Sequence, residues 1–464
     1  MNKKNQAELV FLPLGGCGEI GMNLNAYGYG PANDRRWILI DVGVTFGGDD
    51  TPGIDLITPD VSFFEEQGDR IDAIFLTHAH EDHIGAIGLL LPLLHTRAPL
   101  YATAFTAHLV AAKLAERGQS HIDVNVVPLG GEIEVGPFTV QYITLTHSIP
   151  EPNALAITTP LGRIMHTGDW KIDPDPLVGE ETDVETLTRM GDEGVLAMVC
   201  DSTNVFVEGE SGSEGTVRTN LIELIGTLKG KVAVTTFASN VARVATVIEA
   251  ARQAGRSVCL LGRSMHKITK AAVETGVIKN LPDLVDEENA GSFPDDKILY
   301  LCTGSQGEAR AALGRIAYGE HRNDTLGEDD TVIFSSRVIP GNEKGIFAMQ
   351  NTLAESGVRI ITDRDRAKPI HVSGHPARDE LRRMYQWVRP QIAVPVHGER
   401  RHIVEHAAYA RGLQVGQAVT PRNGDLIRLA PGKPETVDIV PNGRMYLDGN
   451  RMVPAGSEGL RERI

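Results

Sequence analysis

The sequence predicts an α/β protein in which one α/β domain is interrupted by a second. Three observations point to this fold class. Short apolar runs in the first 200 residues end in histidine or aspartate, strands and helices alternate from residue 216 to 350, and a later strand ends in another histidine. The chain has 464 residues, more than one ordinary core holds, so at least two domains are expected.

The first domain is expected over residues 1–215. Its strand-like runs span residues 7–16, 37–44, 72–78, 138–147 and 163–170. Four residues that can bind metals lie at or near the ends of these runs: Asp41, His78, His147 and Asp169. Because open α/β sheets place their sites at the carboxyl ends of strands, these side chains are expected at one edge.

The second domain is expected over residues 216–350. Helices are predicted at 216–230, 239–255, 264–276 and 308–317, and strands at 231–237, 257–262, 297–304 and 331–336. Strands that alternate with helices of this length indicate parallel βαβ units.

Residues 351–425 are expected to return to the first domain. There "KPIHVSGH" and the strand "QIAVPVHGE" flank a helix predicted at 378–390 and are interpreted as two strand ends that carry His375 and His397. Residues 426–464 are rich in proline and glycine and are interpreted as a linker or a short strand-bearing tail.

The composition narrows the class of protein. The net charge of −16 argues against a generally basic nucleic-acid binder, although a local groove can still be basic. The four cysteines lie far apart, which argues against a zinc ribbon or a disulfide framework. The N-terminus has no signal-peptide pattern and no apolar stretch is long enough to span a bilayer, so a cytoplasmic protein without membrane contact is expected.

The stretch "LTHAHEDHIGA" carries the main chemical signal. It contains H-x-H-x-D-H, formed by His78, His80, Asp82 and His83. Imidazoles and a carboxylate are zinc ligands, and one ion needs about four of them. Two ions need more ligands than this stretch offers, and the remaining candidates are His147, Asp169 and His397. A single histidine at a strand end is more often a packing residue, so these three candidates depend on the motif.

A strand followed by T-H-x-H-x-D-H-x-G, a later histidine, G-D and a last histidine resembles the metallo-β-lactamase superfamily. The resemblance implies an αββα sandwich with two metal ions at one edge. It assigns His78, His80 and His147 to the first ion and Asp82, His83 and His397 to the second, with Asp169 as the bridge. Asp41 is then expected behind the ligands, where it orients one of them.

The inserted domain, together with "CDSTN", "HVSGHPARDEL" and "VPVHGE", resembles the β-CASP subfamily, which processes nucleic acids. Within that subfamily, "LGGCGEIGMN", "TTFASN" and "TGSQGE" make the chain similar to the ribonuclease J family. That family usually carries a further small C-terminal domain, which is expected to be absent here.

The resemblance implies a ribonuclease that degrades single-stranded RNA from 5′ to 3′, prefers 5′-monophosphate ends, and also cuts internally. It would act in rRNA processing and mRNA decay by two-metal phosphodiester hydrolysis. Asp201 would donate a proton and His375 accept one, and the direction stays open because the two groups are expected to be coupled. The resemblance also implies a homodimer or homotetramer and partners in RNA degradation.

The cofactors implied are two Zn²⁺, with Mn²⁺ as an alternative, because histidine and carboxylate ligands accept either. The resemblance also assigns two loops to the RNA: Ser239, Asn240, His371, Val372, Ser373 and Gly374. For Asn240 the alternative is a helix N-cap, and both roles can hold together.

Two surface features carry weaker expectations. In relatives, the loop after Asp41 and a C-terminal aspartate hold a structural calcium, which here implicates Pro52, Ile54 and Asp448. The alternative is a solvated acidic turn. Four basic residues are candidates for a local RNA groove, with solvated helix faces as the alternative: Arg243, Arg263, Lys267 and Lys270.

Two other functions compete with the ribonuclease. A small-molecule metallo-hydrolase, such as a thioesterase or lactonase, needs neither the inserted domain nor "HVSGH". A non-catalytic RNA-binding subunit usually loses metal ligands, whereas this sequence retains all seven candidates.

Overall fold

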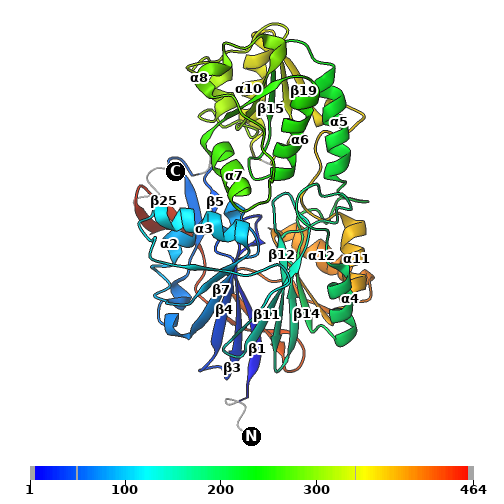
Figure 1. Cartoon of the computed structure of the whole chain (residues 1–464). Coiled ribbons are helices and arrows are strands. Elements are labelled where there is room, and N and C mark those ends of the chain that lie inside the picture. Colours follow the sequence, from blue (N-terminus) through cyan, green and yellow to red (C-terminus); the bar gives the residue numbers. More distant parts are fainter. Residues whose placement is uncertain (1–5, 49–50, 340, 458–464) are drawn as a thin grey trace.

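The computed structural model describes residues 6–48, 51–339 and 341–457. A two-sheet sandwich forms the lower part of the molecule and a separate α/β unit lies above it (Figure 1). The predicted fold class, an αββα sandwich with an inserted α/β domain, is confirmed.

The first sheet of the sandwich has eight strands, in the spatial order β24 (Glu435–Ile439), β23 (Asp425–Ala430), β1 (Glu8–Gly15), β3 (Leu24–Gly30), β4 (Arg36–Ile40), β7 (Ile71–Phe75), β8 (Leu100–Ala102) and β9 (Val124–Val126). The second has seven, in the order β10 (Glu132–Val135), β11 (Phe138–Thr144), β12 (Asn153–Thr159), β13 (Gly162–His166), β14 (Ala197–Asp201), β20 (Ile392–Val396) and β22 (Gln417–Ala418).

Three apolar layers hold the sandwich together. The inner faces of the two sheets pack against each other, with Phe11 and Tyr27 facing Tyr142 and Val394. The outer face of the first sheet is covered by α1 (Glu81–Ile84), α2 (Ile87–Leu90) and α3 (Ala104–Glu116). The outer face of the second is covered by α4 (Val184–Glu193), α11 (Arg378–Val388) and α12 (Arg400–Gly412). Two sheets, each with one face on a common core and one under helices, form the αββα arrangement.

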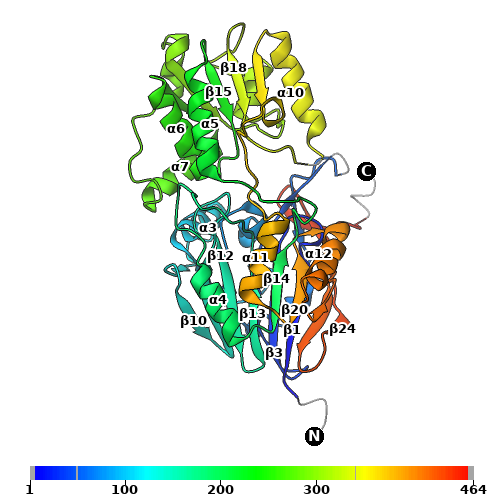
Figure 2. The same ribbon diagram turned by 90° about the vertical axis from the view of Figure 1, so that its right-hand side faces the viewer.

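The inserted unit is a parallel sheet with helices on both faces (Figure 2). Its five strands run in the order β16 (Ser257–Leu261), β17 (Ile298–Cys302), β15 (Val232–Thr235), β18 (Thr331–Phe334) and β19 (Arg359–Thr362). Its helices are α5 (Glu214–Gly226), α6 (Val241–Gln253), α7 (Arg263–Glu274), α8 (Glu287–Ala290), α9 (Ala312–Ala317) and α10 (Glu343–Glu355). β15, β16, β17 and β18 are almost entirely buried, as expected of strands covered on both faces, whereas the edge strand β19 is partly exposed.

Smaller elements complete the described chain. A four-stranded sheet is formed by β26 (Arg451–Pro454), β25 (Arg444–Asp448), β6 (Leu56–Pro59) and β5 (Thr45–Phe46). A two-stranded ladder joins β2 (Cys17–Gly18) to β21 (Gly398–Glu399). The 3₁₀ helices are η2 (Ser62–Phe64), η3 (Gly68–Arg70), η4 (Asp295–Lys297) and η5 (Asp363–Asp365).

The structure differs from the predicted boundaries in three places. The inserted sheet continues past residue 350, because β19 (Arg359–Thr362) pairs with β18. The tail from residue 426 bears strands, which was one of the two alternatives expected, but these strands join sheets of the main fold: β23 and β24 complete the first sheet, and β25 pairs with β6. The "HVSGH" segment is a loop rather than a strand end, so His375 reaches the site without a strand behind it.

Two predictions from composition concern the whole chain. All four cysteines are buried and free, as small apolar residues in strands or loops. In the part of the chain that the structure describes, no helix is long and apolar enough to cross a membrane.

Candidate metal centre and active site

One edge of the sandwich gathers the residues that end the central strands. His78 follows β7, Asp169 follows β13 and His397 follows β20, while Asp201 is the last residue of β14. Parallel pairing of β13, β14 and β20 brings the last three ends side by side. The predicted edge site therefore forms because neighbouring parallel strands stop at the same level.

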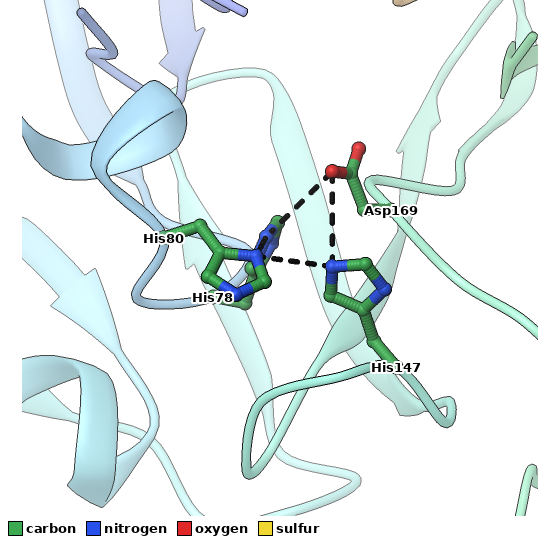
Figure 3. A group of neighbouring side chains, drawn as sticks. All are labelled: His78, His80, His147 and Asp169. Carbon is green, nitrogen blue, oxygen red and sulfur yellow. Dashed lines mark hydrogen bonds and ion pairs between the residues drawn. The ribbon is translucent and has the colours of Figure 1, made fainter. Parts of the chain in front are cut away.

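The first group consists of His78, His80, His147 and Asp169 (Figure 3). His80 Nδ1 lies 3.2 Å from His78 Nε2 and 3.0 Å from His147 Nε2. The nearest carboxylate oxygen of Asp169 is 3.9 Å from the Nε2 atoms of both His78 and His147. Three ring nitrogens and a carboxylate oxygen thus point at one small volume.

The second group consists of Asp82, His83, Asp169 and His397. His83 Nε2 lies 3.2 Å from Asp169 Oδ2, and His397 Nε2 lies 3.3 Å from Asp82 Oδ2. Because Asp169 belongs to both groups, the seven residues predicted as metal ligands form two adjoining clusters that share one carboxylate.

The residues of both groups fit divalent cations. Burial first, then neighbouring imidazoles, lowers the pKa of His78 and His147, so these rings are neutral and offer lone pairs at neutral pH. In the second group burial opposes a charge on His397, but Asp169 and Asp82 raise its pKa to about 10. The buried carboxylates therefore attract positive charge at the place where an ion would bind.

Asp41 supports the second group from behind. Its Oδ2 accepts a 2.7 Å hydrogen bond from His83 Nδ1, and Thr77 donates to both carboxylate oxygens at 2.8 Å. This contact leaves His83 Nε2 directed at the group and fixes the ring orientation. Asn23, which the sequence analysis missed, also reaches this place, with its Nδ2 3.1 Å from His83 Nε2.

A third group adds the predicted proton-transfer residues, Asp201 and His375, to Asp169 and His397. His375 Nδ1 lies 2.8 Å from Asp201 Oδ2, while Thr203 donates to Asp201 Oδ1 through its backbone and its hydroxyl. Burial lowers the pKa of His375, but the Asp201 carboxylate outweighs burial and the net shift is upward. The pair can hold a proton beside the two metal groups.

The two loops assigned to RNA meet the same edge. Ser239 Oγ lies 3.2 Å from His80 Nε2, and the Gly374 carbonyl accepts a 2.5 Å hydrogen bond from His147 Nδ1. Ser373 Oγ accepts from the Nδ2 of Asn204, a residue of "CDSTN" that the sequence analysis did not single out.

The other loop residues differ in how they face the site. The Asn240 side chain caps α6 by accepting from the Arg243 backbone, so its capping role is present. The Val372 side chain is 7% exposed and packs in the core of the inserted unit, which leaves only its backbone for a ligand. His371 lies beside positive charges: burial, then Arg243 and Arg337, lower its pKa.

Arg243 is not a groove residue. Its side chain is fully buried, its Nη2 lies 2.9 Å from Glu214 Oε1, and its Nη1 donates to the Ser335 carbonyl at 2.9 Å. The prediction of a groove residue was wrong because Glu214, the partner of Arg243, lies in a different helix, α5. Lys267 is paired with Glu116 and Lys270 with Glu274, whereas Arg263 is exposed at the start of α7.

Three family descriptions match consecutive parts of the chain. "Beta-lactamase superfamily domain" matches residues 36–188, "Ribonuclease J, beta-CASP domain" matches 229–353, and "Zn-dependent metallo-hydrolase RNA specificity domain" matches 364–421. A ribonuclease J from Sinorhizobium meliloti is 50% identical over 98% of this chain and 80% of its own length. The chain belongs to the ribonuclease J family. The predicted enzyme class, a metal-dependent nuclease with a metallo-β-lactamase fold, is thereby confirmed.

Other members of the ribonuclease J family are also similar over nearly the whole chain. Relatives from Mycolicibacterium smegmatis and Corynebacterium glutamicum are each 40% identical over 97% of this chain. The matched region is 80% of the length of the first relative and 62% of the length of the second. A crystal structure of a protein of unknown function from Enterococcus faecalis V583 superposes with a TM-score of 0.62 at 17% identity, over 91% of this chain and all of that one. This last likeness concerns the fold alone.

The residues proposed for calcium belong to none of the three groups described above. Pro52 and Ile54 belong to the loop before β6, and Asp448 ends β25, which pairs with β6. Tyr446 pairs with Ile57, so the same register brings Asp448 towards Asp55 at the end of that loop. The acidic residues Asp49 and Asp50 lie outside the described residues, as does the end of the predicted tail, 458–464.

Proposed function

We propose that this chain hydrolyses the phosphodiester bonds of single-stranded RNA with two divalent cations, degrading from 5′-monophosphate ends and also cutting internally. The observation that carries this proposal is the shared Asp169: it joins the first and second groups and also lies in the group that contains Asp201 and His375. Two divalent cations held by these groups would activate water and neutralise charge on a phosphoryl group.

We assign the ions to named side chains. His78, His80 and His147 would hold one ion, Asp82, His83 and His397 the other, and Asp169 would contact both. The donor set accepts Zn²⁺ or Mn²⁺. A structural Ca²⁺ would use the backbone of Pro52 and Ile54 together with Asp448.

The chain's own groups would manage the proton and the substrate. His375 and Asp201 share a hydrogen bond beside the cation sites, so one can give a proton to the leaving oxygen while the other retains charge. The "HVSGH" loop (residues 371–375) would receive the 5′-phosphate, because its Gly374 contacts His147 at the metal edge and its Ser373 contacts Asn204, which Arg337 also reaches. The positive charge of Arg337 favours a phosphate over the uncharged carbonyl of a thioester or lactone.

The test compares RNA substrates that differ only at the 5′ end. A single-stranded RNA labelled at each end, with a 5′-monophosphate, 5′-triphosphate or 5′-hydroxyl, is incubated with Zn²⁺, Mn²⁺ or EDTA. Mononucleotide release that is fastest from the 5′-monophosphate and is stopped by EDTA is expected. Internal fragments from the 5′-triphosphate RNA would report the endonuclease activity.

The variant for this test is Asp82→Ala/His83→Ala, and the matched control is His121→Ala in an exposed loop. The double variant is expected to lose RNA hydrolysis and one equivalent of metal, and the control to retain both. RNA turnover that persists in the double variant would contradict the proposed function. Hydrolysis of a thioester or lactone, with no action on RNA, would favour the small-molecule hydrolase instead.

A further inference from the structure

Two histidines of the first group are held from outside by the loops assigned to RNA. His80 directs Nδ1 into the group and His147 directs Nε2 into it, at 3.0 Å from each other (Figure 3). The outer nitrogen of His80 meets Ser239 Oγ at 3.2 Å, and the outer nitrogen of His147 meets the Gly374 carbonyl at 2.5 Å. Each ring therefore bridges the metal group and a loop.

The hydrogen-bonding capacity of Ser239 suits such a bridge. When His80 Nδ1 is a metal ligand, Nε2 carries the proton and donates it to Ser239 Oγ. A serine hydroxyl accepts hydrogen bonds and still has one proton to donate. Ser239 can thus accept from His80 and donate to a phosphate oxygen at the same time, which links the RNA to a metal ligand through one side chain.

The position of Ser239 depends on how the inserted unit sits on the sandwich. Ser239 lies in the turn between β15 and α6, two residues before Val241. The Val241 side chain is 1% exposed and belongs to the same apolar cluster as the outer face of the first sheet. Helix α7 adjoins α3 there, and Lys267 Nζ pairs with Glu116 at 2.6 Å (Figure 1). Lifting the inserted unit would withdraw the hydroxyl from His80.

We infer that Ser239 is a positioning residue for His80 and that it couples metal binding in the first group to the seating of the inserted unit. The inference rests on the proposed assignment of His78, His80 and His147 to a metal ion. Removal of an outer partner of a metal-binding histidine weakens metal affinity by about 10- to 100-fold. Because coupling is reciprocal, a metal ion in the first group also stabilises the seated position of the inserted unit.

The test measures metal affinity rather than RNA cleavage. Zn²⁺ is titrated into the metal-free chain against a chromogenic chelator, for wild type, Ser239→Ala, Ser239→Thr and Ser292→Ala. In Ser239→Ala the dissociation constant of one of the two ions is expected to rise about tenfold. Ser239→Thr keeps the hydroxyl and is expected to restore binding. Ser292→Ala is the matched control in the inserted unit, since its hydroxyl donates to the Asn289 carbonyl and belongs to no metal group.

Two backgrounds identify which ion is weakened. Ser239→Ala is combined with Asp82→Ala/His83→Ala, which leaves the first group, and with His78→Ala/His147→Ala, which leaves the second. Ser239→Ala is expected to weaken Zn²⁺ binding only in the Asp82→Ala/His83→Ala background. Hydrogen–deuterium exchange of the 238–243 segment is expected to slow on Zn²⁺ addition in wild type and not in Ser239→Ala.

The inference is overturned if Ser239→Ala binds both ions within twofold of wild type, or if it weakens both ions equally. It is also overturned if exchange in the 238–243 segment responds to Zn²⁺ equally in both proteins. Each of these measurements is independent of RNA hydrolysis. A failure of the proposed function can therefore be distinguished from a failure of this inference.

Discussion

The His375 ring and the Asp201 carboxylate form one hydrogen-bonded pair, with 2.8 Å between Nδ1 and Oδ2. The pair is not isolated: His375 Nδ1 also lies 3.9 Å from Asp169, the carboxylate common to both metal groups. The Asp201 side chain is fully buried and the His375 side chain is 23% exposed, so the pair can share a proton and also reach solvent through the imidazole.

Removing either member of this pair is expected to slow hydrolysis about 10²- to 10⁴-fold, because each would lose a proton-transfer partner. Asp201→Asn, His375→Gln and the double variant are compared in single-turnover cleavage of a 5′-monophosphorylated RNA with saturating Mn²⁺. The double variant should be about as slow as the slower single variant, because coupled groups act as a unit. Strictly multiplicative effects at full metal occupancy would show that the residues act independently.

Gly374 places its carbonyl on His147 only because it has no side chain. A Cβ at this position would lie 2.5 Å from Ser148 Oγ and 2.8 Å from the His147 ring. Gly374→Ala is therefore expected to push the "HVSGH" loop away and to lower kcat/KM about 100-fold, as displacements near 1 Å do in active sites. Stopped-flow cleavage kinetics measure this effect.

The matched control for that substitution is Gly226→Ala, at the end of α5, where a Cβ would meet no described atom within 4 Å. This variant should retain wild-type kinetics and be neutral or slightly more stable, by up to about 1 kcal/mol, because alanine favours the helix. Equal losses in the two variants would mean that the Gly374 contact has no special role.

The sequence was sufficient to predict much of this edge because its signals are local. H-x-H-x-D-H places His78, His80, Asp82 and His83 on one turn, and apolar runs that end in polar residues mark the strand ends. The boundaries were less accurate, because β19 and β23 are recognised as sheet members only by their partners far along the chain.

Contacts between distant segments could not be predicted. Ser239 and His80 are 159 positions apart, and Gly374 and His147 are 227 apart, so no periodicity reports their distance. Arg243 illustrates the same problem: a basic residue on a helix suggests a surface, and only the packing of α5 against α6 shows that Glu214 buries its charge.

The buried position of Arg243 predicts a stability effect. Arg243→Ala would leave the Glu214 carboxylate, 2% exposed, without its partner, which is expected to cost about 3–5 kcal/mol. Urea unfolding of the metal-free chain measures this loss. Arg263→Ala, an exposed cation, is the matched control and should change stability by no more than about 0.5 kcal/mol. A fully stable Arg243→Ala with weakened RNA binding would instead support the groove role.

The buried His406 is expected to make the stability of the folded chain depend on pH. Its ring is fully buried, with Nδ1 2.8 Å from Ser202 Oγ and Nε2 2.9 Å from the Tyr385 hydroxyl, and burial lowers its pKa to about 4. Above pH 6.5 this histidine is neutral in both folded and unfolded chains and contributes no pH dependence. Between pH 6.5 and 4 the unfolded chain takes up a proton that the folded chain refuses, so stability falls as pH falls.

Attributing the loss of stability in acid to His406 requires a comparison with His406→Gln, because other buried histidines also titrate. From pH 7.5 to 4.5, metal-free wild type is expected to lose about 2–3 kcal/mol more than His406→Gln, which is the linkage expected for one group with this shift. Urea midpoints at the two pH values, both in EDTA, provide the measurement. Parallel losses in the two proteins would show that His406 is protonated in the folded chain, and that its hydrogen bonds to Ser202 and Tyr385 do not exclude the charge.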